Sequence, residues 1–444
     1  MKRREFLKKT GTAAAASIVA PYILPSGRLF ASTGNRMNNH VVLVMFAGGV
    51  RQQESILQRY LDDSQEGDPY PGNIMTNMLT GAAPEQKIVY GTGNGGMNPI
   101  PSILSTPLDQ QGTVFREVQA LSAGHYGGLN SLLQGSTVTT QGLKQKPVNP
   151  TIFEYLRRHG GYSATDMWFV GNNLVNSTAL LNYSVHQDYG AQYGANFLAP
   201  TITFGPKGQE FLSDAKVYHP ENELDPMYQL KYFLDNTFEQ YGSNLETIGN
   251  TAAEKQNIKQ FLEHMFDKTQ NNSVDHAPVS DNNDLQAVGY ACEVMKWFKP
   301  ALTVVNLNSV DTCHSNFTGY LQNLHRADHA VGHIWNYIQN EIPEMAGSTT
   351  MLATPECGRN QNPNAVLDEN NWLAYDHSDQ NALRVFNMMV GPNVPSNLSI
   401  GSENNPVGIT SDSMLTIADI LGVKPEVQSA GMLAPGTQSL FDRI

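Results

Sequence analysis

The sequence of 444 residues has little cysteine, an excess of acidic over basic side chains, and no long apolar segment. Its three cysteines, Cys292, Cys313 and Cys357, are too few for a disulfide framework, so stability must come from a hydrophobic core. Lys and Arg number 28 against 41 Asp and Glu, and the net charge of -13 disfavours binding to nucleic acid. No apolar run reaches the roughly 20 residues of a transmembrane helix, so we expect no stable membrane span.

The first residues carry a targeting pattern. The basic segment Lys2-Arg3-Arg4-Glu5-Phe6-Leu7-Lys8-Lys9 precedes an uncharged stretch at 10–26 that is rich in Ala and Gly. The arginine pair resembles the twin-arginine export signal, although Lys2 stands where that signal usually has Ser or Thr. We predict a signal peptide over residues 1–31, recognition by the export machinery, and a periplasmic or secreted protein. The alternative is an ordinary basic start of a cytoplasmic protein.

Strand-like and helix-like patterns alternate along the rest of the chain. Short apolar runs typical of buried strands occur at 40–46, 113–121, 167–170, 301–307, 349–354 and 385–390. Helical patterns occur at 150–158, 285–298, 317–338 and 412–421. This alternation predicts an α/β fold with a mostly parallel central sheet and helices on both faces.

Residues 32–444 are expected to form a single α/β domain. About 410 residues exceed the usual domain size, but a large domain with an insertion accounts for them as well as two domains do. The alternation breaks between about 180 and 280, where Asn, Asp, Gly and Pro are scattered between helical patterns at 227–238 and 252–266. We interpret this region as an inserted cap.

Side chains of the metal-ligand type follow several of the predicted strands. They are Asp311 and His314, then Glu356, then Asp376 and His377. Because ligands bind at the carboxyl ends of strands in open α/β sheets, we expect these side chains to lie close together. Carboxylate and imidazole groups together suit zinc or manganese. The sequence therefore predicts a divalent metal site, with zinc as the first choice and manganese or calcium as alternatives.

These clusters resemble those of the alkaline phosphatase superfamily, which contains phosphatases, sulfatases and phosphomutases. The closest similarity is to an uncharacterised exported branch, domain of unknown function 1501, which also carries twin-arginine signals. Three elements match that branch in order and approximate spacing: Asp311-Thr312-Cys313-His314, Pro355-Glu356-Cys357-Gly358-Arg359 and Asp376-His377-Ser378. The resemblance is closer over residues 285–422 than over 40–170, and implies an alkaline-phosphatase-like fold.

The resemblance also implies a role for each matching residue. Asp311, His314 and His377 would hold one metal, and Glu356 would stand at the usual aspartate ligand of a second. Asp376, beside His377, is a further candidate ligand. Two such metals would clamp the attacking and leaving oxygens of a phosphate or sulfate ester.

Three departures from the superfamily pattern make this site incomplete and atypical. The first strand ends in Ala47, where the superfamily usually has a metal-binding aspartate, and Glu54 is the nearest acid. The position of the catalytic Ser, Thr or modified Cys is occupied by His125 or Tyr126, so covalent catalysis is in doubt. Cys357 replaces a histidine of the typical phosphatases.

The leading hypothesis is an exported metal-dependent hydrolase of an anionic ester, either a small molecule or a polymer. Glu356 or His125 would act as the base, and Arg359 would hold anionic oxygens. A structural ion pair is an equally good interpretation of Arg359. The alternative function is a non-catalytic binding or surface protein that retains the fold. A phosphomutase-like transferase is less favoured because the region of the expected nucleophile lacks an obvious Ser or Thr.

Some polar residues have simpler interpretations. Asp328 falls on the apolar face of the helix predicted at 317–338 and needs a partner there, most simply a hydrogen bond. His329 and His333 have a spacing that can bind metal, but we treat them as ordinary helix residues. For Cys313 and Cys357, buried unreactive thiols are favoured over metal ligation or a mutual disulfide.

Overall fold

The computed structural model describes residues 35–60, 70–84, 90, 98–141, 145–171, 181–204 and 251–444. The predicted signal peptide and the helical pattern at 227–238 lie outside the described residues. Among the helices of the described ranges, none has the length and apolarity needed to cross a bilayer.

Eight strands form one sheet with the order β10-β4-β9-β8-β1-β7-β5-β6. Their bounds are β1 His40–Phe46, β4 Thr113–Gln119, β5 Met167–Gly171, β6 Asn196–Leu198, β7 Leu302–Leu307, β8 Thr349–Pro355, β9 Arg384–Val390 and β10 Leu398–Ile400. Only β9 runs antiparallel to its neighbours. The prediction of a mostly parallel α/β sheet is therefore confirmed. A separate two-stranded sheet joins β2 (Arg59–Tyr60) and β3 (Tyr70–Pro71).

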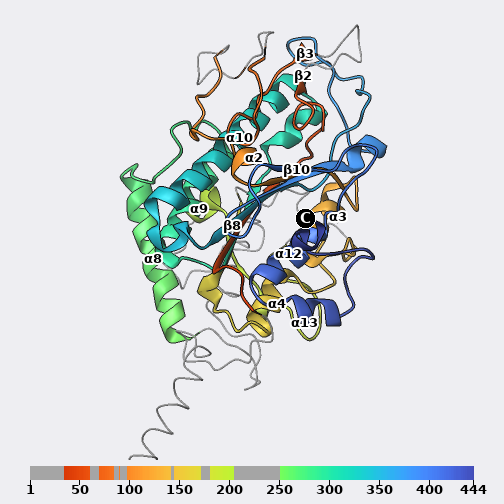
Figure 1. The fold of residues 1–444 in the computed structure, drawn as a ribbon. Coiled ribbons are helices and arrows are strands. Elements are labelled where there is room, and N and C mark those ends of the chain that lie inside the picture. Colours follow the sequence, from red (N-terminus) through yellow and green to blue (C-terminus); the bar gives the residue numbers. More distant parts are fainter. Residues whose placement is uncertain are drawn as a thin grey trace, which may run out of the picture.

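Helices cover both faces of the large sheet (Figure 1). One face packs against α8 (Ala252–Gln270), α9 (Asn283–Phe298) and α10 (Phe317–Glu341). The other face packs against α3 (His125–Gln134), α4 (Ile152–Arg158), α12 (Asp412–Ile420) and α13 (Lys424–Ser429). The shorter helices are α2 (Leu108–Gln111), α5 (Pro200–Thr203) and α11 (Pro343–Ala346).

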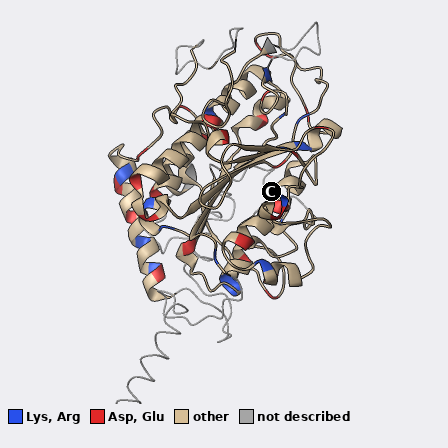
Figure 2. Cartoon of the chain, viewed as in Figure 1, with Lys and Arg blue, Asp and Glu red and all other residues tan. Residues whose placement is uncertain are grey.

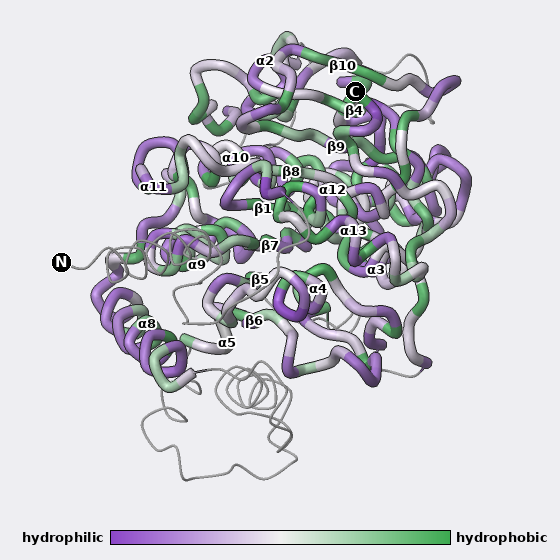
Figure 3. The backbone as a smooth tube through the Cα atoms, turned by 60° about the horizontal axis from the view of Figure 1, so that its bottom comes forward, coloured by the Kyte–Doolittle hydropathy of each residue, from purple (hydrophilic) through white to green (hydrophobic). Residues whose placement is uncertain are grey.

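The central strands are apolar because both of their faces are buried. Along β1, Val42 and Val44 point into the core beneath α10, whereas Val41 and Leu43 point into the core beneath α12. No charged residue occurs in β1, β7 or β8, and Figure 2 shows the charges on the surrounding helices and loops. In Figure 3, α8 is mostly hydrophilic, and its few buried side chains pack at the edge of the sheet.

The strand register brings the carboxyl ends of three neighbouring strands to one edge. Phe46, the last residue of β1, pairs with Leu307 at the end of β7 and with Pro355 at the end of β8. The loops that follow these strands therefore begin side by side. This edge is the place where an open α/β sheet binds its ligands.

Asp328, the polar residue on the apolar face of the long helix α10, has hydrogen-bond partners in the core. Asp328 is fully buried and accepts hydrogen bonds from the backbone N–H groups of Asn77 and Met78 and from the Asn77 side chain. The predicted hydrogen-bonded partner is confirmed. Burial raises the pKa of Asp328 to about 7, and the three donors oppose that rise.

Candidate metal centre

The turn after β1 allows two other loops to approach closely. Gly48 and Gly49 have φ angles of +140° and +74°, which favour glycine. A Cβ atom at Gly48 would lie 2.5 Å from the backbone nitrogen of Asp311, and one at Gly49 would lie 2.7 Å from the carbonyl oxygen of Gly358. The absence of both side chains lets the loops after β7 and β8 converge on the end of β1.

Glu356 is held at this junction and has no exposed surface. Its Oε1 accepts a hydrogen bond from the N–H of Gly48 at 2.6 Å, and its Oε2 lies 3.4 Å from the N–H of Gly49. Successive N–H groups of this kind form a concave site for an anion. Backbone donors therefore stand beside Ala47, where the resemblance expects a metal-binding aspartate, and they stabilise the buried carboxylate.

His314 and His377 are oriented by acceptors on their Nδ1 atoms. Nδ1 of His314 lies 2.7 Å from Oδ1 of Asp376, and Nδ1 of His377 lies 2.7 Å from the carbonyl oxygen of Ala123. An acceptor opposite Nδ1 places the ring proton there, which leaves Nε2 with a lone pair. The two rings lie 4.9 Å apart, so both imidazoles are prepared to ligate one ion.

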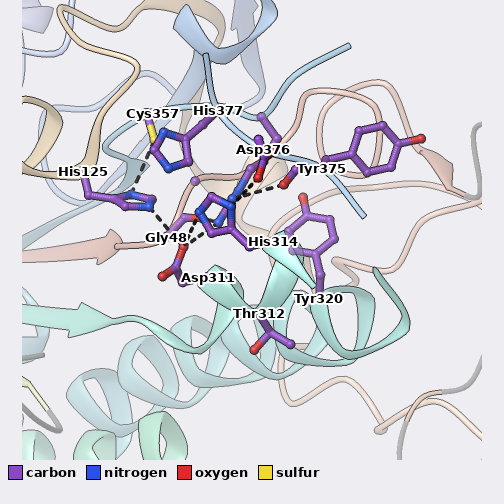
Figure 4. A network of polar contacts seen from close by, with 12 residues as sticks. Gly48, His125, Asp311, Thr312, His314, Tyr320, Cys357, Tyr375, Asp376 and His377 are labelled. Atoms are coloured by element: carbon purple, nitrogen blue, oxygen red, sulfur yellow. Dashed lines mark hydrogen bonds and ion pairs between the residues drawn. The ribbon is translucent and has the colours of Figure 1, made fainter. Parts of the chain in front are cut away.

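His125 begins α3, and Figure 4 shows its ring beside Asp311 and Cys357. Its Nδ1 is 2.7 Å from Oε1 of Glu356, and its Nε2 is 3.0 Å from Oδ1 of Asp311. The contact at Nε2 has the distance of an ion pair but lacks the alignment of a hydrogen bond. Burial lowers the pKa of His125, but Asp311, Cys357 and Glu356 outweigh burial and raise it to about 12.

Arg359 lies behind the site and has no exposed surface. Its guanidinium donates to Oδ1 of Asp311 at 2.8 Å and to the carbonyl oxygens of Gly48 and Tyr375. Burial raises the pKa of Asp311, but His125 and Arg359 outweigh it and hold that pKa below its usual range. Arg359 therefore fixes the Asp311 carboxylate, which favours the structural ion pair over direct contact with a substrate.

All three cysteines are buried, and none forms a disulfide. Sγ of Cys357 lies 3.7 Å from Oε1 of Glu356 and 3.8 Å from Nδ1 of His125. Burial raises the pKa of the Cys357 thiol to about 11 and that of Cys313 to about 12. Both thiols are protonated near neutral pH unless a cation replaces the proton.

Two acids predicted near the metals have other partners. Both oxygens of Glu54 accept hydrogen bonds from the Arg51 side chain, so Glu54 does not replace the missing carboxylate after β1. Asp376 contacts Nδ1 of His314, on the opposite side of the ring from Nε2, which lies 3.4 Å from Oδ1 of Asp311. The sequence predicts Asp376 as a further metal ligand, whereas in the structure its carboxylate is placed to orient the His314 ring.

Two sets of donor atoms within the described ranges have the spacing of a metal site. The first contains His125, His314 and His377, and the second contains His125, Glu356 and Cys357. Nε2 of His125 is buried, and its 3.0 Å contact with Oδ1 of Asp311 lacks the alignment of a hydrogen bond, so this nitrogen is not fully satisfied within the described residues. Imidazole, carboxylate and thiolate donors fit zinc best, since calcium takes oxygen ligands. The residues present therefore fit a divalent ion of the zinc type.

Several groups of this site could not be predicted from the sequence. The N–H groups of Gly48 and Gly49 and the carbonyl oxygen of Ala123 are backbone atoms, so their roles depend on chain geometry. The Gly48-Gly49 pair at a strand end was the one available signal for a close approach. The sequence placed His125 only by rough alignment, and the structure brings it to the centre of the site.

No protein-family profile matches this chain, and no curated protein does. Solved structures with partial overlap include the PsFucS1 sulfatase from Pseudoalteromonas sp. (TM-score 0.42, 11% identity, 97% of this chain and 76% of that chain). They also include an alkaline phosphatase superfamily protein from Vibrio parahaemolyticus (TM-score 0.39, 12% identity, 91% and 71%). A third is BT4656 in complex with its substrate D-glucosamine-2-N,6-O-disulfate (TM-score 0.37, 11% identity, 91% and 82%).

With identities of 11–12% and TM-scores of 0.37–0.42, these similarities do not place the chain in a family. The fold class follows from the sheet itself, which defines an α/β protein with a mostly parallel sheet and a histidine- and carboxylate-rich site at the carboxyl ends of its strands. The more specific similarity to domain of unknown function 1501 stays a prediction.

Proposed function

We propose that this chain is an exported, metal-dependent hydrolase of a phosphate or sulfate ester, related to the alkaline phosphatase superfamily. The observation that carries the proposal is the pair of imidazoles, His314 and His377, whose Nδ1 atoms face acceptors, while Nε2 of His314 lies 3.4 Å from another candidate ligand, Asp311. They stand at the edge of the sheet where α/β proteins bind ligands.

The chain's own residues divide into ligands and supports. His314 and His377 would bind the ion together with Asp311, whose Oδ1 lies 3.4 Å from Nε2 of His314, and Asp376 orients the His314 ring. Arg359 fixes the Asp311 carboxylate from behind. A divalent ion held there lowers the pKa of bound water and polarises an anionic ester.

The two candidate bases differ in access to solvent. Glu356 has no exposed side-chain surface, so it has no direct contact with a substrate water. The His125 side chain is 12% exposed and lies between Glu356 and the metal ligand Asp311. The hydroxyl of Ser122, just before α3, is engaged with the backbone of Gly124 in a local turn, and the helix begins with His125 where a nucleophile would be expected. Hydrolysis by bound water is therefore favoured over a covalent intermediate.

One observation favours the second candidate function, a non-catalytic binding or surface protein. A protonated His125 already compensates both Glu356 and Asp311. The imidazolium would then be a structural cation in the place of a metal, and the site would be the remnant of an ancestral centre. The two functions differ in metal content and in turnover.

Elemental analysis of the chain purified without chelators tests the proposal. We expect zinc or manganese in stoichiometric amount, hydrolysis of an aryl phosphate or aryl sulfate, and loss of both in His314→Ala. His264→Ala is the matched control, because His264 lies on α8 beside Trp297 and away from the candidate site. A folded wild-type protein with neither metal nor turnover would support the non-catalytic alternative.

Export is tested separately. The double variant Arg3→Lys with Arg4→Lys should leave the precursor in the cytoplasm, as judged by fractionation. Undiminished export of that variant would contradict the twin-arginine assignment.

A further inference from the structure

We propose that the imidazole of His125 bridges two metal ions, one on each ring nitrogen. The inference rests on the proposed function, since it requires a chain that binds metal. It adds that the two donor sets of the site form one dinuclear centre with a shared histidine. It also assigns a metal-binding role to the residue that stands at the nucleophile position.

The inner donor set consists of Glu356 and Cys357 and lies on the Nδ1 side of His125. Nδ1 is 2.7 Å from Oε1 of Glu356 and 3.8 Å from Sγ of Cys357, and the carboxylate and sulfur are 3.7 Å apart. Two ligands of a tetrahedral zinc ion lie about 3.3–3.8 Å apart. Only the shortest of the three separations must lengthen for one ion to contact all three donors. Both protein partners of Nδ1 are fully buried, which holds their donor atoms in place.

The outer donor set consists of Asp311, His314 and His377 and lies toward the Nε2 side of His125. Oδ1 of Asp311 is 3.0 Å from Nε2 of His125 and 3.4 Å from Nε2 of His314. The His377 ring lies 4.2 Å from the His125 ring, and the three imidazoles have donor atoms within 4.8 Å of one another. Figure 4 shows these rings grouped around Asp311. A second ion therefore has ligands on the opposite nitrogen of the same ring.

The charges of the two sets suit a pair of dications. Glu356, Asp311 and a Cys357 thiolate supply three negative charges, and the imidazolate adds a fourth, which matches two divalent ions. Occupation of both nitrogens releases both N–H protons of the imidazolium, and the Cys357 thiol loses its proton to solvent as well. A bridging ring keeps no nitrogen free to take a proton. His125 would then be a ligand, and this removes it from the candidate bases.

The arrangement also accounts for the departures at this site without assuming loss of function. The aspartate missing at Ala47 is a ligand that the inner ion does not need, because His125 provides its third donor. Cys357 supplies the donor that the typical histidine would supply. The inner ion would then have three protein ligands, His125, Glu356 and Cys357, the number found in catalytic zinc sites.

Titration of the metal-free chain with Co²⁺ tests the bridge without measuring activity. Cobalt bound by thiolate gives a charge-transfer absorption, which reports the inner set through Cys357. Two cobalt ions on one imidazolate couple magnetically, so the electron paramagnetic resonance intensity per cobalt should fall when the second equivalent binds. We expect two equivalents, a thiolate band and this loss of intensity in the wild type.

Three variants test the inner donor set, the outer donor set and the bridging imidazole separately. Cys357→Ser should lose the thiolate band and one equivalent, whereas His314→Gln should keep the band and lose affinity at the outer set. His125→Ala should abolish the coupling, and His264→Gln should behave as the wild type. Circular dichroism of each metal-free variant checks that the fold is retained.

Two outcomes overturn the bridge and leave the hydrolase intact. One is two equivalents of cobalt whose resonance intensities add without loss, which would show independent sites. The other is a single equivalent in the wild type with a spectrum unchanged in Cys357→Ser. Failure of the hydrolase itself would be seen differently, as a chain that binds both ions and shows the coupling but does not turn over any ester. A chain that binds no cobalt would overturn both proposals.

Discussion

His329 on α10 is a buried histidine whose charge state should control the acid stability of the fold. Its side chain is 2% exposed, and neither ring nitrogen has a hydrogen-bond partner among the described residues. Burial, together with the smaller effects of His333 and His325, lowers the pKa of His329 from its ordinary value of 6.5 to about 4. The folded chain therefore keeps this ring neutral in a pH range where the unfolded chain protonates it.

The sign and size of the effect follow from linkage. Between pH 6.5 and about pH 4, the imidazole of His329 is protonated in the unfolded state but neutral in the folded state. The free energy of unfolding therefore decreases as the pH falls through this window. At pH 5 the loss from His329 alone is about 2 kcal/mol, and below pH 4 it approaches about 3.4 kcal/mol. A loss of 2 kcal/mol is a large share of the marginal stability of a typical protein.

The contribution of His329 can be isolated by comparing the free energy of unfolding of the wild type with that of a His329 variant. Asp328 and Glu154 have pKa values raised to about 7 by burial, so their folded forms keep protons longer and lose stability as the pH rises. The wild type alone therefore gives a mixed pH profile. Chemical denaturation of the wild type and His329→Leu at pH 5 and pH 7.5 should show a difference that shifts by about 2 kcal/mol in favour of the variant at pH 5. The same shift in His329→Phe would be the check, and a difference independent of pH would refute the reasoning.

Two further predictions concern the candidate site. A Cβ added at Gly128 would lie 2.5 Å from the carbonyl oxygen of Glu356, so Gly128→Ala should lower the free energy of unfolding by about 1–3 kcal/mol. Gly347 has open space around it, so the control variant Gly347→Ala should change that free energy by less than about 0.5 kcal/mol. Chemical denaturation measures both changes. Asp376→Asn should lower zinc affinity about 10–100-fold in calorimetric titration, because the carboxylate orients His314. An affinity equal to that of the wild type would show that Asp376 does not support the ligand.

Local patterns sufficed for the long strands and helices because each buries a continuous face. The run His40–Phe46 is apolar throughout because β1 lies in the centre of a parallel sheet, and α10 shows its apolar stripe because it covers that sheet. The strands β6 and β10 have three residues each and lie at the two edges of the sheet. Segments this short carry no periodicity, so sequence patterns did not mark them.

The sequence by itself determined which chemical groups follow which strand. Asp311, His314 and Glu356 stand within a few residues of strand ends, and parallel strands with short loops leave such groups at one edge. Only the tertiary structure showed which residues contact one another in the site: Asp376 faces Nδ1 of His314, and His125 lies between the carboxylates of Glu356 and Asp311. These relations join residues from loops far apart in the chain, and several use backbone N–H and C=O groups. Every residue type carries those backbone groups, so only the folded path of the chain gives them a role.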